Sequence, residues 1–314
     1  MRISVAKESY TSEGRVAAAP SAVRSLTTRG AAVLVEQGAG SASGWPDDSY
    51  IRAGAEICPT PEELYGRADL VWKVMPPSPH EARLVREDCR VYCLGHALPP
   101  DRAGAVSRRV ALDAHPAVRA AMGSIAGRIA VHAASHALQR QNGGRGLLLG
   151  GVVGVEPAEV VVIGAGDAGR AAVAASLGVG ASVRVLDVDL AQLQALHQSL
   201  PGARTLVATP AAIERALAVA DVVIACVRDA SGVAPRVASR DHLSLMARGA
   251  VVVDLSITDG GAFESTPITD LDSPFHDVEG VVFVGVPNFA GAVPRTSSVA
   301  LSAAALPMIE AALD

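Results

Sequence analysis

Aromatic residues are scarce in this 314-residue sequence, which contains four Phe, four Tyr and two Trp residues and is 3% aromatic. Hydrophobic residues nevertheless make up 50% of the chain, so its core must consist mainly of Ala, Val and Leu. Small and β-branched residues suit buried parallel strands that are covered by closely packed helices. The composition therefore favours an α/β fold.

Cysteine is also rare, and the four residues are too few for a disulfide scaffold in a chain of this length. Cys89, Cys93 and His96 lie close together in the sequence, but no second pair of metal ligands accompanies them. Cys93 belongs to an apolar segment, where burial of a small thiol explains it. We predict no metal site.

Long apolar runs and basic clusters are both missing. No stretch of about 18 apolar residues could form a transmembrane helix, and no signal peptide precedes the first predicted strand. The formal net charge is −5, with 27 basic and 32 acidic residues, which argues against nucleic acid as a partner. We expect a soluble, cytoplasmic protein that acts on a small molecule, away from membranes.

Glycines follow one apolar segment, residues 160–163, in the pattern Gly164-x-Gly166-x-x-Gly169. Gly164 permits a tight turn, Gly166 allows a pyrophosphate to approach the backbone, and Gly169 allows a helix to pack closely on a strand. A second apolar segment then ends at Asp187. Such a turn also occurs in domains that bind no nucleotide, but the combination with a terminal acid predicts a dinucleotide site.

The cofactor expected at this site is NAD. Backbone N–H groups at the start of the helix, at Asp167 and Ala168, would face the pyrophosphate. Asp187 lies about 20 residues beyond the first glycine, where a carboxylate accepts hydrogen bonds from the adenosine ribose. A 2′-phosphate would meet a like charge there, and no Arg follows immediately, so NAD is favoured over NADP.

The order of predicted strands and helices indicates two Rossmann-like domains with mostly parallel sheets and an active site in the cleft between them. We assign residues 1–125 and 295–314 to the substrate (catalytic) domain, and residues 126–294 to the NAD-binding domain. Residues 124–141 predict a long helix, and a C-terminal helix is expected to pack on the first domain. Ligands of open α/β sheets bind at the carboxyl ends of the strands. Candidate site residues after the strands are Lys7, Arg15, Lys73, His96, Asp113, 226–231, Thr258, Asp259 and Asn288.

Three long segments then resemble one family in the order in which the family has them. They are MRISVAKESYTSEGRVAAAP, QNGGRGLLLGGVVGVEPAEVVVIGAGDAGRAA and GVPNFAGAVPRTSSVAL. The chain resembles the alanine dehydrogenase and transhydrogenase α-subunit family across nearly its whole length. This resemblance implies NAD-linked oxidative deamination of a small amino acid, or hydride exchange, in a homodimer or a larger homo-oligomer.

The resemblance also implies roles for individual residues. Arg15 matches the family's Arg that binds the substrate carboxylate, and His96 matches the His that protonates the keto oxygen. Asn288 matches an Asn near the nicotinamide.

Other positions depart from the family pattern. Met75 stands where the family has a substrate-binding Lys, and Lys73, two residues earlier, is the candidate substitute. Thr258 stands at the position of an assisting Asp, with Asp259 one step later. Gly123 replaces a Ser that contacts the nucleotide.

These departures leave two hypotheses. The first is an NAD-dependent oxidoreductase that acts on the C–N bond of an amino acid or imine other than alanine, with Arg15, His96, Lys73 and Asp259 as catalytic residues. The second is a non-redox protein of the same fold, similar to a cyclodeaminase or lyase, that retains bound NAD.

Overall fold

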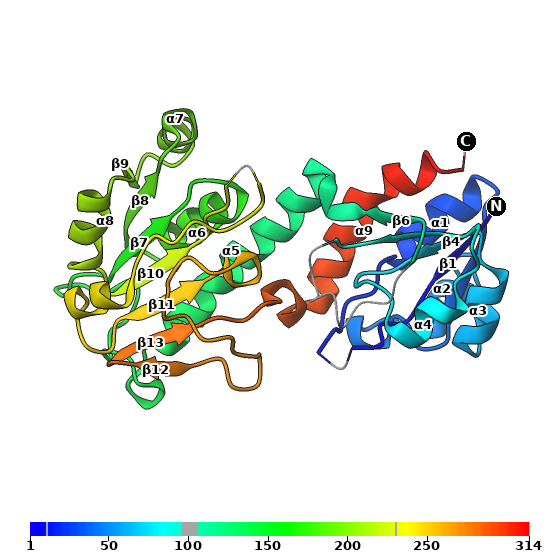
Figure 1. Ribbon diagram of the computed structural model, residues 1–314, viewed down its shortest axis with the longest axis horizontal. Coiled ribbons are helices and arrows are strands. Elements are labelled where there is room, and N and C mark those ends of the chain that lie inside the picture. The colour runs from blue at the N-terminus through cyan, green and yellow to red at the C-terminus, as the bar shows by residue number, and fades with distance from the viewer. Residues whose placement is uncertain (11, 96–105, 230, 314) are drawn as a thin grey trace. The chain divides into compact units, whose positions relative to one another are not determined.

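The computed structural model describes residues 1–10, 12–95, 106–229 and 231–313. The chain divides into two compact units (Figure 1). Unit 1 comprises Met1–Met122 and Ala290–Asp314, and unit 2 comprises Gly123–Phe289. The predicted α/β class with mostly parallel sheets is confirmed in both units. The assignment of substrate and NAD to separate units stays a prediction.

Unit 1 contains a six-stranded sheet with the order β3-β2-β1-β4-β5-β6. All of its neighbouring strands pair in parallel. The strands are β1 (Arg2–Val5), β2 (Ala32–Glu36), β3 (Glu56–Cys58), β4 (Leu70–Trp72), β5 (Arg90–Cys93) and β6 (Arg109–Ala111). Because the strands run in one direction, the segments that follow them meet at one edge of the sheet, where ligands of such folds bind.

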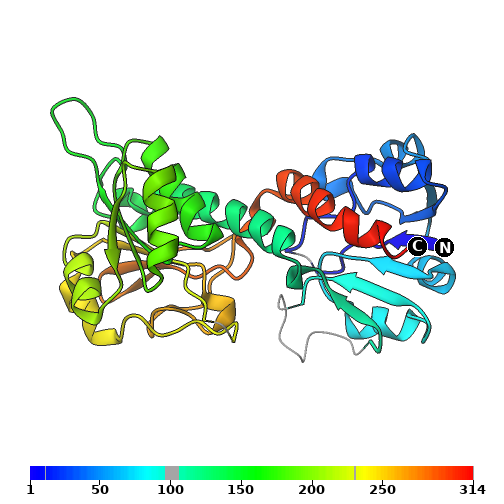
Figure 2. The same ribbon diagram turned by 90° about the horizontal axis from the view of Figure 1, so that it is seen from above.

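Helices cover both faces of this sheet. They are α1 (Pro20–Thr28), α2 (Asp47–Ile51), α3 (Pro61–Arg67), α4 (Pro79–Leu84) and α9 (Pro294–Glu310). Helices α1 and α9 pack on one face, and α3 packs on the other (Figure 2). The expectation that the C-terminal helix packs on the first domain is confirmed, and Arg29 Nη1 lies 3.4 Å from Glu310 Oε2.

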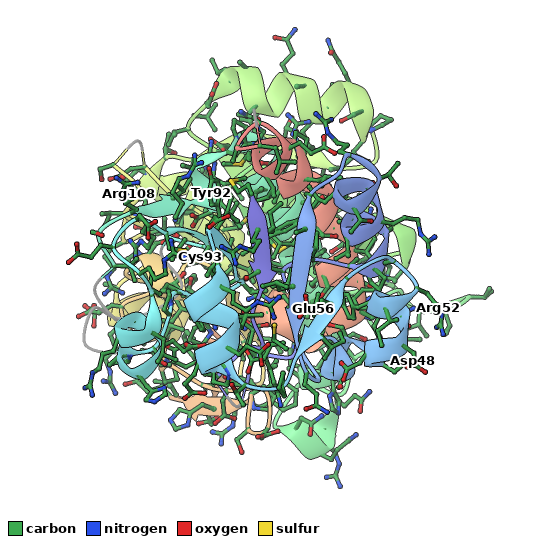
Figure 3. All side chains as sticks on the ribbon, turned by 90° about the vertical axis from the view of Figure 1, so that its right-hand side faces the viewer. Asp48, Arg52, Glu56, Tyr92, Cys93 and Arg108 are labelled. Atoms are coloured by element: carbon green, nitrogen blue, oxygen red, sulfur yellow. The ribbon has the colours of Figure 1, made fainter. Side chains whose placement is uncertain are left out.

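Local signals in the sequence explain several helix starts in unit 1. Thr60 accepts a hydrogen bond from the backbone N–H of Glu63, as the spacing predicted. Ser78 and Glu81 form a complete capping box at the start of α4. Cys93 lies on β5 and is fully buried (Figure 3).

Unit 2 contains a seven-stranded sheet with the order β12-β13-β11-β10-β7-β8-β9. The strands are β7 (Glu159–Ile163), β8 (Ser182–Asp187), β9 (Arg204–Val207), β10 (Val222–Ala225), β11 (Val251–Asp254), β12 (His276–Val278) and β13 (Val281–Val284). Only β12, which the sequence analysis missed, pairs antiparallel among the described strands of this sheet. Its three residues, His-Asp-Val, carry no apolar alternation that would reveal a strand. The strand order reverses between β7 and β10, and open α/β folds bind dinucleotides at such a point.

The helices of unit 2 cover both faces of its sheet. They are α6 (Asp167–Gly178), α7 (Leu190–Ser199) and α8 (Pro210–Leu217), together with most of α5 (Pro116–Ala137). Helices α5, α6 and α7 share one apolar cluster with the sheet, and α8 belongs to the other. The helix predicted near residues 242–247 is instead a 3₁₀ helix at Arg240–Leu245.

The boundaries predicted for the long helix were wrong at both ends. Helix α5 begins at Pro116, eight residues before the predicted start, because a proline fits the first turn of a helix. It ends at Ala137, and a 3₁₀ turn at Arg140–Asn142 leads into Gly143, which has a φ of 88°. Within the described residues, no helix combines the length and the apolar character needed to cross a membrane.

Close approach of two helices in unit 2 depends on one glycine. A Cβ atom added at Gly127 of α5 would lie 2.1 Å from the carbonyl oxygen of Ala168 in α6. We expect Gly127→Ala to lower the free energy of unfolding by at least about 1–3 kcal/mol, since the backbone must shift. Gly178→Ala is the matched control, because nothing lies within 4 Å of its added Cβ. Urea denaturation followed by circular dichroism measures both, and equal stability of the two variants would refute the packing argument.

Candidate functional site

The turn between β7 and α6 has the shape of a dinucleotide-binding loop. A Cβ on Gly164 would lie 2.4 Å from the Cys226 carbonyl oxygen, and one on Gly169 would lie 1.9 Å from the Gly164 carbonyl oxygen. These glycines are therefore required by packing. Gly166 differs, because nothing lies within 4 Å of an added Cβ. Its open side leaves the backbone accessible to a pyrophosphate.

A carboxylate is fixed beside this turn at the end of β8. Asp187 Oδ2 accepts a hydrogen bond from the backbone N–H of Ala165 at 2.6 Å, and Oδ1 accepts one from Asp189 N–H at 2.8 Å. Helix α6 begins at Asp167, and its N-cap residue, Gly166, has no side chain that could cap the first-turn N–H groups. The residues of this loop fit the ribose and pyrophosphate of a dinucleotide.

In unit 1, the segment after β1 contains a buried ion pair. Arg15 Nε donates to Glu13 Oε1 at 2.7 Å, and Arg15 Nη2 donates to Glu13 Oε2 at 2.6 Å. Two thioethers lie against the same guanidinium, with Met75 Sδ 3.9 Å from Nη2 and Met122 Sδ 3.7 Å from Nη1. The two-point contact with Glu13 fixes the plane of the guanidinium group.

A small pocket opens beside this ion pair. It has a volume of about 170 Å³, and its charged and polar lining includes Lys7, Glu8, Glu13, Arg15 and Ser41. Drug-sized ligands occupy pockets of about 300–1,000 Å³. This smaller space suits a molecule of the size of an amino acid.

Lys73 is fully buried and already surrounded by acceptors. Its Nζ lies 2.6 Å from Glu81 Oε1 and 3.7 Å from Glu8 Oε2, and it donates to the Lys7 carbonyl oxygen at 3.2 Å. Burial alone would lower the pKa of Lys73, but Glu8 and Glu81 outweigh this effect and raise it. A role in binding substrate would require the ammonium group to leave these carboxylates.

Glu8 lies between this network and Met75. Its oxygens accept hydrogen bonds from the backbone N–H groups of Val74 at 2.8 Å and Met75 at 3.2 Å. Burial raises the pKa of Glu8 to about 7, although Lys73 and the two hydrogen bonds oppose the rise. Burial also acts on Glu81, but its closer contact with Lys73 holds the pKa of that carboxyl below the usual value. Lys73 therefore pairs mainly with Glu81, and the rise that burial causes in the pKa of Glu8 is only partly offset.

The remaining predicted residues lie in separate places. Asp259 belongs to unit 2, where its Oδ1 lies 2.9 Å from Arg228 Nη2. Thr258 is exposed and Asn288 is half-buried. Asp113 Oδ1 accepts a hydrogen bond from Gly95 N–H at 2.7 Å. His96 lies outside the described residues.

The structure thus brings together Arg15, Lys73 and Met75 in unit 1, and the glycines and Asp187 in unit 2. The sequence analysis missed Glu8, Glu13 and Glu81 as the partners of the two cations. A signal existed for Glu13, since Glu13-x-Arg15 places opposite charges two residues apart. No local pattern linked Lys73 to Glu8, because 65 positions separate them.

Comparison with known proteins identifies the family. Residues 4–113 match the description "Alanine dehydrogenase/PNT, N-terminal domain", and residues 130–314 match "Alanine dehydrogenase/PNT, C-terminal domain". The chain belongs to the alanine dehydrogenase/PNT family. This is a family of NAD-dependent oxidoreductases of amino acid metabolism, and the predicted resemblance is confirmed.

Individual relatives agree with this family. An alanine dehydrogenase from Methanococcus maripaludis is 35% identical over 98% of this chain and 86% of its own length. Alanine dehydrogenase 2 from Staphylococcus aureus is 37% identical over the same shares. A solved L-alanine dehydrogenase aligns with a TM-score of 0.91 at 34% identity, covering 98% of this chain and 89% of that one. A transhydrogenase from Sinorhizobium meliloti aligns with a TM-score of 0.85 at 30% identity, covering 100% and 94%.

The raised pKa of Glu8 predicts a pH effect on stability. Its pKa is about 7 in the folded protein against the usual 4.5, so its contribution is fully present below pH 4.5 and is lost as the pH rises through about 7. We expect the wild type to lose up to about 3 kcal/mol of unfolding free energy, relative to Glu8→Gln, between pH 4.5 and 8.

Urea denaturation at several pH values measures this difference. Glu87→Gln, at an exposed position, is the control that should follow the wild type. Parallel pH profiles for the wild type and Glu8→Gln would show that Glu8 does not titrate in this range.

Proposed function

We propose that this protein is an NAD-dependent oxidoreductase that acts on the C–N bond of an amino acid, or of the related imine, with an apolar side chain larger than that of alanine. The observation that carries this proposal is the contact between Met75 Sδ and Arg15 Nη2. The carboxylate-binding Arg expected for the family is present, but a thioether stands beside it in place of a second cation. Three of the four relatives described above are named alanine dehydrogenases, so alanine is the reference substrate.

In this proposal Arg15 binds the substrate carboxylate. Glu13 orients the guanidinium group before the substrate arrives, which reduces the entropy lost on binding. Arg15 and Glu13 both line the 170 Å³ pocket. The size of the pocket and the positive charge of Arg15 in its lining together support a small carboxylate-bearing ligand.

Met75 determines which substrates are favoured. A thioether cannot donate a proton or carry a charge, so the substrate oxygen loses a contact that a Lys would supply. Loss of such a contact typically costs about 100-fold or more in rate. Apolar contact with the Met75 side chain compensates only when the substrate has a larger side chain than alanine.

Proton transfer is assigned to His96, with Lys73 or Asp259 assisting. Imidazole titrates near neutral pH and serves as an acid or a base. Asp113 fixes the backbone of Gly95 immediately before His96. Asp259 Oδ1 lies 2.9 Å from Arg228 Nη2, so a role in proton transfer would require Asp259 to act beside this guanidinium group.

Residues Gly164, Gly166, Asp167, Ala168, Gly169 and Asp187 would hold NAD in unit 2, with Asn288 near the nicotinamide. NAD, when bound, accepts a hydride from the substrate carbon that carries the nitrogen.

We also propose a homodimer or a larger homo-oligomer. In support, Leu148, Val152, Val153 and Val155 are 60–104% exposed in one short segment of unit 2, which suits a protein interface. Light scattering of the purified protein measures its mass.

The substrate preference is tested with L-alanine, L-norvaline and L-leucine in the presence of NAD, by following NADH absorbance. We expect the wild type to have a higher kcat/KM for norvaline or leucine than for alanine. Met75→Lys should raise kcat/KM for alanine by about 100-fold, because it restores the charged contact.

Met75→Leu is the control, since it preserves the apolar character and should keep the wild-type preference. A wild type that prefers alanine, or a Met75→Lys variant without any gain for alanine, would contradict the assigned specificity. Copurified NAD without turnover of any amino acid, keto acid or imine would instead support the non-redox hypothesis.

A further inference from the structure

The dinucleotide-binding turn of unit 2 carries an unusual negative charge. Asp167 is the first residue of α6, and its side chain is exposed. A pyrophosphate at such a turn binds to backbone N–H groups at the helix N-terminus and to the positive end of the helix dipole. Asp167 therefore adds a negative charge to the helix end at which the ligand would place its own negative charges.

Asp167 forms no ion pair with the described residues. The guanidinium group of Arg170, three residues later in α6, donates to the side chain of Gln192 at 3.1 Å. A second carboxylate, that of Asp187, is fixed at the same turn by the Ala165 N–H at 2.6 Å. Two carboxylates, those of Asp167 and Asp187, therefore belong to this turn.

The packing of α5 fixes the base of the Asp167 side chain. A Cβ atom added at Gly123 would lie 3.4 Å from Asp167 Cβ and 3.4 Å from the backbone nitrogen of Ala168. Helix α5 therefore lies directly against the turn. The Cβ atom of Asp167 therefore has a defined position near the N–H groups to which a pyrophosphate would bind.

We propose that the carboxylate of Asp167 lowers the affinity of this protein for its dinucleotide. In the free protein, the carboxylate stabilises the N-terminus of α6. When a pyrophosphate binds, the same carboxylate repels it. This inference rests on the proposed function, because it assumes that the turn binds NAD.

Removal of the charge tests the proposal. Asn has the size of Asp and remains favourable near a helix N-terminus, so Asp167→Asn changes little except the charge. We expect this variant to bind NAD and NADH about tenfold more tightly than the wild type at low ionic strength, as measured by isothermal titration calorimetry. The gain should shrink in 1 M salt, where the Debye length is about 3 Å.

A matched control removes a charge elsewhere in unit 2. Asp241 is an exposed acid in the first turn of the 3₁₀ helix Arg240–Leu245. Asp241→Asn should therefore bind NAD like the wild type at every salt concentration. Thermal denaturation without NAD provides a second readout, because Asp167→Asn should slightly lower the melting temperature of the free protein while increasing its rise on addition of NAD.

The outcomes separate this inference from the proposed function. If the wild type binds NAD and Asp167→Asn binds it no more tightly, the inference is wrong and the proposed function stands. A gain that does not depend on salt would also overturn it, because repulsion between charges must be screened. If neither protein binds NAD, both the inference and the proposed function fail.

Discussion

The ion pair between Glu13 and Arg15 is the interaction on which the account of the substrate site depends. Both side chains are almost fully buried, and burial of an unpaired guanidinium would cost several kcal/mol. Glu13 therefore allows a cation to stay inside unit 1, at the edge of the sheet where ligands of this fold bind. This pair holds Arg15 in place, and the proposed effect of the neighbouring Met75 on the substrate depends on Arg15 being held there.

Lys73 is the second cation of this region, and it is paired with carboxylates other than that of Glu13. Lys73 is enclosed by Glu8 and Glu81, and this contact connects β4 to the segments that follow β1 and begin α4. Met75 carries no charge, and Lys73 remains paired with Glu8 and Glu81. Burial raises the pKa of Glu8 to about 7, although the backbone N–H groups of Val74 and Met75 donate to its carboxylate and oppose the rise.

The sequence predicted those features that depend on short-range patterns. Gly164, Gly166 and Gly169 predicted the turn, and the structure shows that Gly164 and Gly169 are required by packing and that an added Cβ at Gly166 would meet open space. Thr60 and Glu63 predicted a helix start, since capping is a local interaction. The partners of Lys73 could not be predicted, because the parallel sheet brings them together from distant segments. The start of α5 was misplaced because the prediction did not use Pro116, which fits the first turn of a helix. Strand β12 is only three residues long, and its pairing with β13 gives it a defined conformation. The pairing of Asp259 with Arg228 likewise depends on the order of β10 and β11.

In the proposed reaction, Arg15 of unit 1 would bind the substrate carboxylate and the turn between β7 and α6 of unit 2 would bind NAD. The central claim is that hydride passes directly from the α-carbon of an amino acid to NAD. This claim is tested most directly with L-norvaline and L-alanine that carry deuterium at the α-carbon, by NMR of the nicotinamide product. The account predicts that deuterium appears at C4 of the reduced nicotinamide, with more product from norvaline than from alanine. Deuterium that is lost to water or retained in the amino acid, with no label at C4, would contradict it.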